Sequence, residues 1–143
     1  MSHLLWLVSL VGLLCTAVVF GTDMFFLTVG RPALRLASPL AGTEVMGIFH
    51  LYGDARMPIW GVLAILSNLS LGLLTRGGHR GLYLLSFAVL VLLQTEAAKT
   101  GRTIEDARGI QASWDRSVMI RVPLLSVSIL AQTIALSGYL AGM

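Results

Sequence analysis

Four long apolar stretches, separated by polar segments, dominate the hydrophobic pattern of the chain. They cover about residues 4–29, 58–74, 81–98 and 115–141, and only isolated charged residues interrupt them. At about 1.5 Å of rise per residue, helices of these lengths approach or exceed the ~30 Å hydrocarbon core of a bilayer. We therefore predict an all-α integral membrane protein, a four-helix bundle that forms a single transmembrane domain over residues 1–143.

The connection between the first two spans covers residues 30–57 and is expected to hold a short helix of its own. Arg31 and Pro32 are expected to end the first span, because proline disrupts a helix interior. Thr43 is a suitable N-cap for the short helix, which is too polar to cross the bilayer and should lie at the membrane interface. Pro58 then suits the first turn of the second span, unless the two helices continue through a kink there.

Composition agrees with a membrane location. Hydrophobic residues make up 56% of the chain and charged residues 12%, against about 25% charged in soluble domains. The net charge of +3 comes from basic residues beside apolar spans, where they orient a membrane protein. We therefore expect membrane lipids as partners and no nucleic acid.

The basic residues are distributed unequally between the two ends of the bundle. Those in or beside the two long connections are Arg31, Arg35, Arg56, Lys99, Arg102, Arg108 and Arg116, whereas the turn at 75–80 carries Arg76 and Arg80. Positively charged loops stay in the cytoplasm. This predicts a bacterial plasma-membrane protein with its long loops cytoplasmic and both termini outside.

Acidic residues gather at that same end of the predicted bundle. They are Asp23, Glu44, Asp54, Glu96, Glu105, Asp106 and Asp115, accompanied by His50, Gln94 and Arg121. The opposite half is expected to be almost purely apolar, apart from Asn68 and small hydroxyls. The one-sided distribution places any polar site at the long-loop end.

Three ionisable residues, Asp23, Glu96 and Arg121, lie inside the apolar spans. A charge at a helix centre costs roughly 2.5–3.5 kcal/mol on insertion scales, so such residues pair inside the bundle or extend to the interface. Because three different spans each carry an ionisable residue near the same end of the bundle, we favour a shared polar pocket. In it, Arg121 is expected to pair with Asp23, Glu96 or both.

His50 and Asp54 are four residues apart, so on a helix they share one face. One interpretation is a histidine beside a carboxylate that moves a proton near neutral pH; the other is an interfacial histidine near a helix-capping carboxylate. Trp60 and Trp114 flank the same end. They belong to an aromatic belt or line a pocket for an aromatic substrate.

A metal or another cofactor is not expected. The residues that offer ligand atoms at this end are Glu44, His50, Asp54 and Glu96. They show none of the spacings typical of zinc or di-iron sites, and His50 alone is a weak basis for a haem ligand. Cys15 is the only cysteine, which excludes an internal disulfide or a cysteine-based metal cage.

Four segments carry a resemblance to a known family. They are GTDMFF at 21–26, RPALR at 31–35, HLYGDARMP at 50–58 and SWDRSVMIR at 113–121. Together with the four-span layout, they resemble the anthrone-oxygenase-like family of small four-helix membrane proteins over nearly the whole chain. The best-matching positions are Pro32, Pro58, Trp114 and Arg121. The pair His50 and Asp54 does not carry over from the family pattern.

The resemblance implies an oxygenase without a redox cofactor, which converts an anthrone to an anthraquinone in polyketide tailoring. In this hypothesis His50, assisted by Asp54, removes an acidic C–H proton, and Arg121 holds the resulting phenolate. The expected substrate-binding residues are Asp23, Trp60, Glu96, Trp114 and Asn68. The substrate would be a lipophilic aromatic molecule that enters from the bilayer.

Two other functions remain open. The first is a protein that binds or transports a small molecule, lipid or quinone, or an accessory subunit without catalysis. The buried charges would then contact a ligand or a proton. Four helices are few for a lone transporter, so this version implies a homo-oligomer. A purely structural role, with small residues packing helices, is the third hypothesis.

Overall fold

The computed structural model describes residues 3–100 and 107–141, except for the side chains of residues 54, 96–100, 107–113 and 139–141. All of the described residues are helical apart from two short turns, at 37–38 and 75–77. The elements in chain order are α1 (His3–Phe25), a π-helical turn η1 (Phe26–Gly30), α2 (Arg31–Leu36), α3 (Pro39–Leu74), α4 (Gly78–Thr100) and α5 (Ala107–Ala141).

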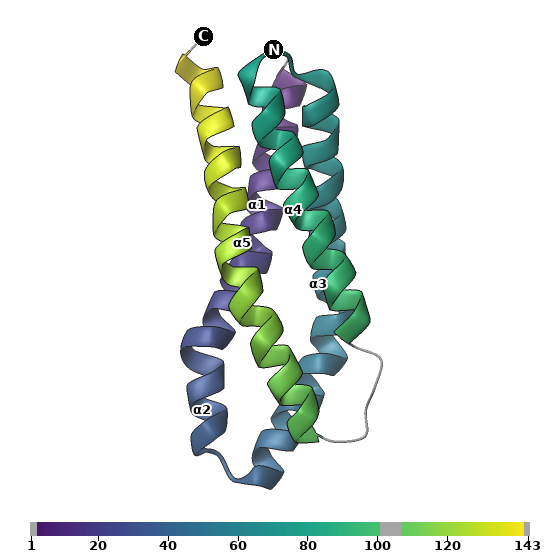
Figure 1. Ribbon diagram of the computed structural model, residues 1–143, viewed down its shortest axis with the longest axis vertical. Helices are drawn as coiled ribbons and strands as arrows, with labels where there is room; N and C mark the ends of the chain where they lie inside the picture. Colours follow the sequence, from purple (N-terminus) through teal and green to yellow (C-terminus); the bar gives the residue numbers. More distant parts are fainter. Residues whose placement is uncertain (1–2, 101–106, 142–143) are drawn as a thin grey trace.

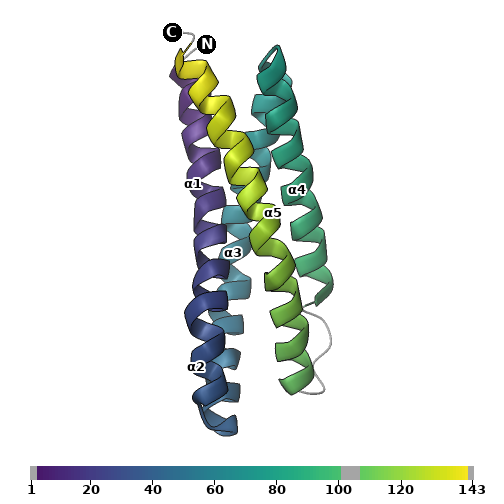
Figure 2. The ribbon, with the colours of Figure 1, turned by 60° about the vertical axis from the view of Figure 1, so that its left-hand side comes forward.

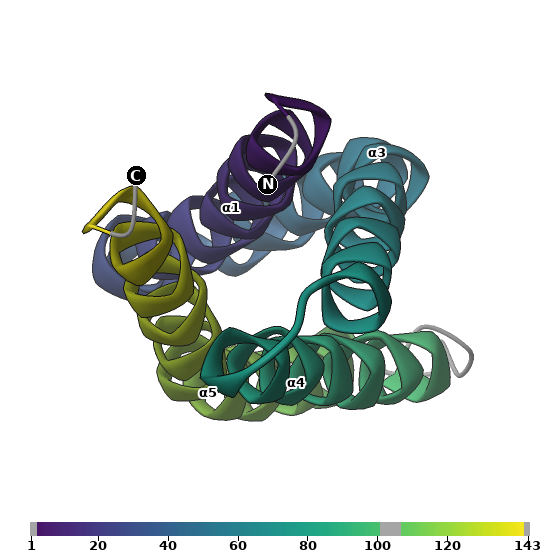
Figure 3. The same ribbon diagram turned by 90° about the horizontal axis from the view of Figure 1, so that it is seen from above.

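The four long helices stand side by side around a common axis. Seen from above, α1 lies beside α3, α3 beside α4, α4 beside α5, and α5 beside α1 (Figure 3), and each of these neighbouring pairs is in contact. Both termini and the turn between α3 and α4 lie at one end, and the turn between α2 and α3 lies at the other (Figure 1). The all-helical class predicted from the sequence is therefore confirmed.

The first helix is longer than the sequence predicted. Arg31 and Pro32 do not end it, because α1 continues through η1 into α2, and α2 extends its line away from the termini (Figure 2). The π-turn brings the Arg31 N–H to the Phe26 carbonyl. Pro32 then lies at the start of α2, where the missing N–H of a proline costs little. The helical path ends at Ala37, whose backbone is extended.

The helix that contains the second span, α3, also begins earlier than expected. Its N-cap is Ser38, whose hydroxyl accepts a hydrogen bond from the Ala41 N–H at 3.3 Å, and Pro39 occupies the first turn. Thr43 lies inside the helix and bonds back to the Pro39 carbonyl. The helix passes through Pro58 without ending. The short helix expected in this connection is thus the first half of α3 and is continuous with the second span, which is the alternative that the sequence left open.

Three helical segments are long and apolar enough to cross a membrane. They are His3–Leu36, Ala55–Leu74 and Trp114–Gly138. At about 1.5 Å per residue, the 36 residues of α3 measure ~54 Å, well beyond a ~30 Å hydrocarbon core. The first half of α3 and the start of α5 therefore extend past the candidate spans. The last predicted span, from about residue 115, agrees with the candidate span that begins at Trp114, within a helix α5 that already begins at Ala107.

Three apolar clusters fill the bundle from end to end. The first, nearest the termini, contains Leu71, Tyr83 and Ala135. The middle one contains Cys15, Val19, Ala64, Val89, Leu90, Leu93 and Leu125. The third contains Phe26, Met46, Val118 and Val122. Large hydrophobic side chains also cover the outside of the helices, as expected where lipid replaces water.

Candidate functional site

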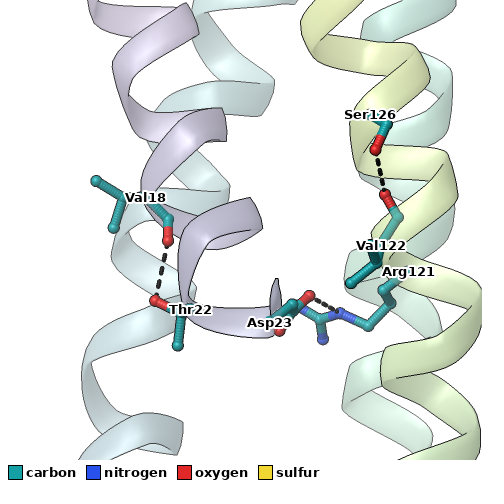
Figure 4. A network of polar contacts seen from close by, with 6 residues as sticks. All are labelled: Val18, Thr22, Asp23, Arg121, Val122 and Ser126. Carbon is teal, nitrogen blue, oxygen red and sulfur yellow. Dashed lines mark hydrogen bonds and ion pairs between the residues drawn. The ribbon is translucent and has the colours of Figure 1, made fainter. Parts of the chain in front are cut away.

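An ion pair joins α1 to α5 inside the candidate spans. The Nε–H of Arg121 donates to Oδ2 of Asp23 at 2.9 Å, and the two side chains are 18% and 9% exposed (Figure 4). Arg121 lies seven residues after Trp114, where the candidate span of α5 begins, so it is ~10 Å inside that end. The pairing of Arg121 with Asp23 expected from the sequence is confirmed.

The nearby hydroxyls do not take part in this ion pair. Thr22 donates to the carbonyl of Val18, and Ser126 donates to that of Val122, at 2.9 Å each (Figure 4). Within the described residues, Asp23 is the one acceptor that Arg121 contacts. A guanidinium carries five N–H donors, and this bond uses only the Nε edge. Among the described side chains, none accepts a hydrogen bond from the terminal nitrogens of Arg121.

A second ion pair lies nearer the start of the candidate span of α5. Nε of Arg31 is 2.8 Å from Oδ2 of Asp115, although its N–H is not aligned for a hydrogen bond. Nη1 of Arg31 contacts Sδ of Met119 at 3.5 Å. This pair was not predicted, because Arg31 was assigned to a loop. Together, the two pairs hold both ends of η1 against α5.

An aromatic group lies close to these pairs. The ring centroids of Phe26 and Trp114 are 3.9 Å apart, and those of His50 and Trp114 are 5.5 Å apart, both with edge-to-face geometry. Met46, one turn before His50, packs in the same cluster as Phe26. His50 and Trp114, predicted to share a site, are thus neighbours, on α3 and α5.

Trp60 and Asn68, also predicted as site residues, do not join this group. Trp60 is 39% exposed and faces outward. Asn68 is fully buried but follows His50 by 18 residues on the same helix, which places it ~27 Å away along α3. The side chains of Asp54 and Glu96 lie outside the described residues.

Asn68 belongs instead to a buried polar layer that the sequence analysis missed. Nε2 of Gln132 on α5 approaches Thr16 Oγ1 at 3.0 Å and Ser86 Oγ at 2.9 Å, from α1 and α4 respectively. Ser128 completes the group through hydrogen bonds with Gln132 and Ser86. The half of the bundle that was expected to be almost purely apolar therefore contains a buried polar layer. In the sequence, the polar residue Gln132 inside the last apolar span could have indicated it.

Asn68 supplies the contribution of α3 to this layer. Its Nδ2 donates to the Ala64 carbonyl at 2.8 Å, while its buried Oδ1 has no hydrogen-bond partner among the described residues. A Cβ added at Gly12 would lie 3.0 Å from Ser67 Cβ and 3.6 Å from Gln132 Oε1. The layer is packed tightly where α1 meets α3, so a side chain at position 12 would require Ser67 to shift by a few tenths of an ångström.

A pocket of about 390 Å³ lies at the end of the bundle that carries the termini. It is lined by Leu5, Leu74, Thr75, Arg76, His79, Tyr83 and Ala135. Tyr83 is buried, and its hydroxyl lies 3.0 Å from that of Ser9. This pocket was not predicted from the sequence, because its walls come from the ends of four different helices.

Neither a metal-binding group nor a similar known protein indicates a function for these residues. Among the described residues, no group of three or more His, Cys, Asp or Glu side chains is placed to hold a metal ion. No family model, curated protein or solved structure matches the chain. A function for this chain is therefore inferred from the arrangement of these residues alone.

Proposed function

We propose that the chain is an integral membrane four-helix bundle that binds a lipophilic aromatic molecule at the Arg121 end and oxidises it. The observation that carries this proposal is the Arg121–Asp23 pair, ~10 Å inside a candidate span. Ionisable residues at such depth are usually functional. The guanidinium is held by one carboxylate at its Nε edge and offers its other donors to a ligand.

The membrane placement includes α4 as a fourth span. Three segments qualify by length and composition, and α4 packs between α3 and α5 in the same bundle. Its outward positions include Leu85, 47% exposed, and Leu92, 62% exposed. Leaving such side chains in water would cost roughly 25 cal/mol per Å² of apolar surface. Lipid around all four helices removes this cost.

The orientation of the bundle follows from its charges. The end with η1, α2 and the start of α3 carries most of the basic residues, and positively charged loops remain cytoplasmic. In this orientation both termini lie outside, and the Arg121 end faces the cytoplasm. Since Phe26, Val118 and their neighbours fill the interior there, the ligand would approach Arg121 between α1 and α5, from the lipid side.

The ligand chemistry follows from the donors and rings at this end. A guanidinium binds planar oxyanions with directed N–H groups, which suits a phenolate or an enolate. Phe26 and Trp114 offer aromatic surface about two helical turns from Arg121 along the bundle. The proposed ligand is therefore a flat, lipophilic aromatic with an acidic oxygen, such as an anthrone.

The proposed reaction is base-assisted oxygenation without a cofactor. His50, with Asp54 one turn later in α3, would remove the acidic C–H proton of the anthrone. The carbanion adds to O₂ and, once protonated, forms a hydroperoxide, which loses water to leave the anthraquinone carbonyl. One O₂ is consumed for each anthrone, with one oxygen atom in the product and one in water. Arg121 would stabilise the negative oxygen throughout.

Oxygen uptake by the purified protein tests this function. Wild-type protein in detergent is expected to consume O₂ and form anthraquinone faster than the spontaneous reaction. Arg121→Lys and His50→Gln should each lose most of this rate, roughly 10²-fold or more. Arg116→Leu, an exposed position on the same helix, is the matched control and should retain it. A wild-type rate equal to the spontaneous rate would reject catalysis.

A binding or transport protein without catalysis is the second candidate. The pocket at the opposite end of the bundle favours it, because a carrier needs access to its ligand from both faces of a membrane. This version retains ligand binding at Arg121 and predicts no oxygen uptake. Measuring binding and oxygen uptake on the same preparation therefore separates the two candidates.

A further inference from the structure

The pocket at the end with the termini is positioned at a membrane surface. Its walls come from the first turn of α1, the end of α3 with the turn that follows it, the first two turns of α4 and the last part of α5. Two candidate spans end close by, at Leu74 and Gly138, and a third begins at His3. Lipid headgroups occupy this depth in a bilayer. At about 390 Å³, the pocket has the size of a small-ligand site.

The pocket is cationic, and no acidic residue of the four long helices is near it. Arg76 and His79 form part of its lining. Measured along each long helix, every acidic residue is at least 13 residues from the lining, the shortest separation being from Tyr83 to Glu96. That separation is about 20 Å. The first turn of α4 also lacks an acidic residue, so the positive end of its dipole is not neutralised there.

The rest of the lining combines apolar walls with a buried hydroxyl. Leu5, Leu74 and Ala135 supply the apolar surface. The hydroxyls of Tyr83 and Ser9 share one hydrogen bond in which either can donate. When Ser9 donates, the Tyr83 hydrogen is available to a ligand oxygen. The pocket thus offers cationic and hydroxyl donors beside an apolar wall.

The imidazole of His79 is held against the backbone of α5. A Cβ added at Gly138 would lie 2.5 Å from His79 Cε1, so the ring lies where any side chain at position 138 would collide with it. Glycine at this position lets the ring lie against α5 while it lines the pocket. Gly138→Ala would displace the ring, which is the mobile end of a side chain, without disturbing the helix.

We propose that this pocket binds the anionic head of an amphiphile, a phosphate or a carboxylate, through Arg76 and His79, with its apolar chain against Leu5 and Leu74. A phospholipid of the surrounding leaflet and a free lipophilic acid share this chemistry. The inference depends on the membrane placement and not on the reaction proposed at Arg121. It adds a second ligand site at the opposite end of the bundle.

Native mass spectrometry of the detergent-purified full chain tests the proposal. The probes are phosphatidylglycerol, phosphatidylcholine with the same acyl chains, and oleate. Wild-type protein is expected to bind phosphatidylglycerol or oleate in preference to phosphatidylcholine. Arg76→Gln and Gly138→Ala should weaken this binding, Arg76→Gln by about tenfold, the effect of losing one charge-assisted hydrogen bond. Arg80→Gln is the matched control, because Arg80 is exposed in the same turn and is not part of the lining.

The pattern of binding among the three probes distinguishes the possible occupants of the pocket. Selective binding of phosphatidylglycerol that Arg76→Gln weakens and Arg80→Gln does not identifies a lipid headgroup as the occupant. The same pattern with oleate alone identifies a free lipophilic acid. Equal binding of phosphatidylcholine, equal effects of the two arginine variants, or no binding of any probe would overturn the proposal. Because no oxygen is measured, the result does not depend on catalysis at Arg121.

Discussion

Removing Arg121 should destabilise the bundle through the carboxylate that it leaves behind. Asp23 and Arg121 are 2.9 Å apart, with side chains 9% and 18% exposed. Breaking a buried pair by deleting one partner typically costs about 3–5 kcal/mol, because the other charge stays buried and uncompensated. Since the pair retains some exposure, we expect Arg121→Leu to lower the free energy of unfolding by about 3 kcal/mol, the lower end of that range.

The double variant separates the charge effect from lost packing. Replacing both Asp23 and Arg121 with leucine removes the uncompensated carboxylate and fills the space with apolar atoms. Such replacements are often neutral or stabilising, so the free energy of unfolding of the double variant should be within about 1 kcal/mol of wild type. The effects of the two single substitutions would then not add up, by well more than the usual error of additivity. The assay is reversible unfolding in mixed micelles with increasing SDS, followed by tryptophan fluorescence and circular dichroism.

The control for this cycle is Arg116→Leu, an exposed position five residues before Arg121 on the same helix. Surface substitutions usually change stability by less than about 0.5 kcal/mol. If Arg121→Leu were no more destabilising than Arg116→Leu, the guanidinium would be solvated and not paired in the folded protein. If the double variant were as unstable as Arg121→Leu alone, the loss would come from packing. Either result would refute the reasoning.

Three further predictions concern other parts of the molecule. Gln132→Leu should lower stability by about 1 kcal/mol through lost interhelical hydrogen bonds, whereas the exposed neighbour Thr133→Leu should have little effect; equal effects would count against the polar layer. In intact cells, an impermeant thiol reagent should label a cysteine at Gly77 but not one at Gly109; equal labelling, or labelling at 109 alone, would reject the proposed orientation. Metal analysis of active protein should find no stoichiometric iron, copper or haem, and finding one would overturn the expectation that none is required.

The ion pair at Arg121 was predictable because the constraint on it is simple. A guanidinium does not lose its proton to avoid lipid, so an arginine within an apolar span needs an acceptor. Asp23 was one of two acidic residues at comparable depth. The all-helical class followed equally directly, because the apolar stretches are 17 residues or longer, the length of a spanning helix and not of a β-strand, and a helix satisfies its own backbone groups in lipid.

The second ion pair and the helix boundaries were not predictable in the same way. Proline normally ends a helix, and the rule fails at Pro32 because a π-turn precedes it and moves it to the start of α2. With the helix assumed to end there, Arg31 was read as a loop charge, and its partner Asp115 could not be identified. Local sequence does not show that η1 is present, because packing against α5 helps to hold that turn.

The buried polar layer and the pocket depend on which helices meet at the same height. Gln132, Thr16 and Ser86 lie in three separate apolar spans, and each alone is consistent with a hydroxyl or amide that bonds within its own helix. Their contact follows from the bundle register. The pocket likewise combines residues from four helix ends, which no spacing along the chain brings together.

Binding of a hydroxylated anthraquinone tests most directly whether Arg121 holds a ligand oxyanion. Its phenol and phenolate forms differ in visible absorbance, so the charge of the bound ligand is read from its spectrum. At a pH where the free compound is neutral, wild-type protein and Arg116→Leu should shift the bound ligand to the phenolate spectrum. The Asp23/Arg121 double leucine variant, which is expected to fold, should not produce this shift. The same phenolate spectrum with that variant, or no binding to wild type, would contradict the account.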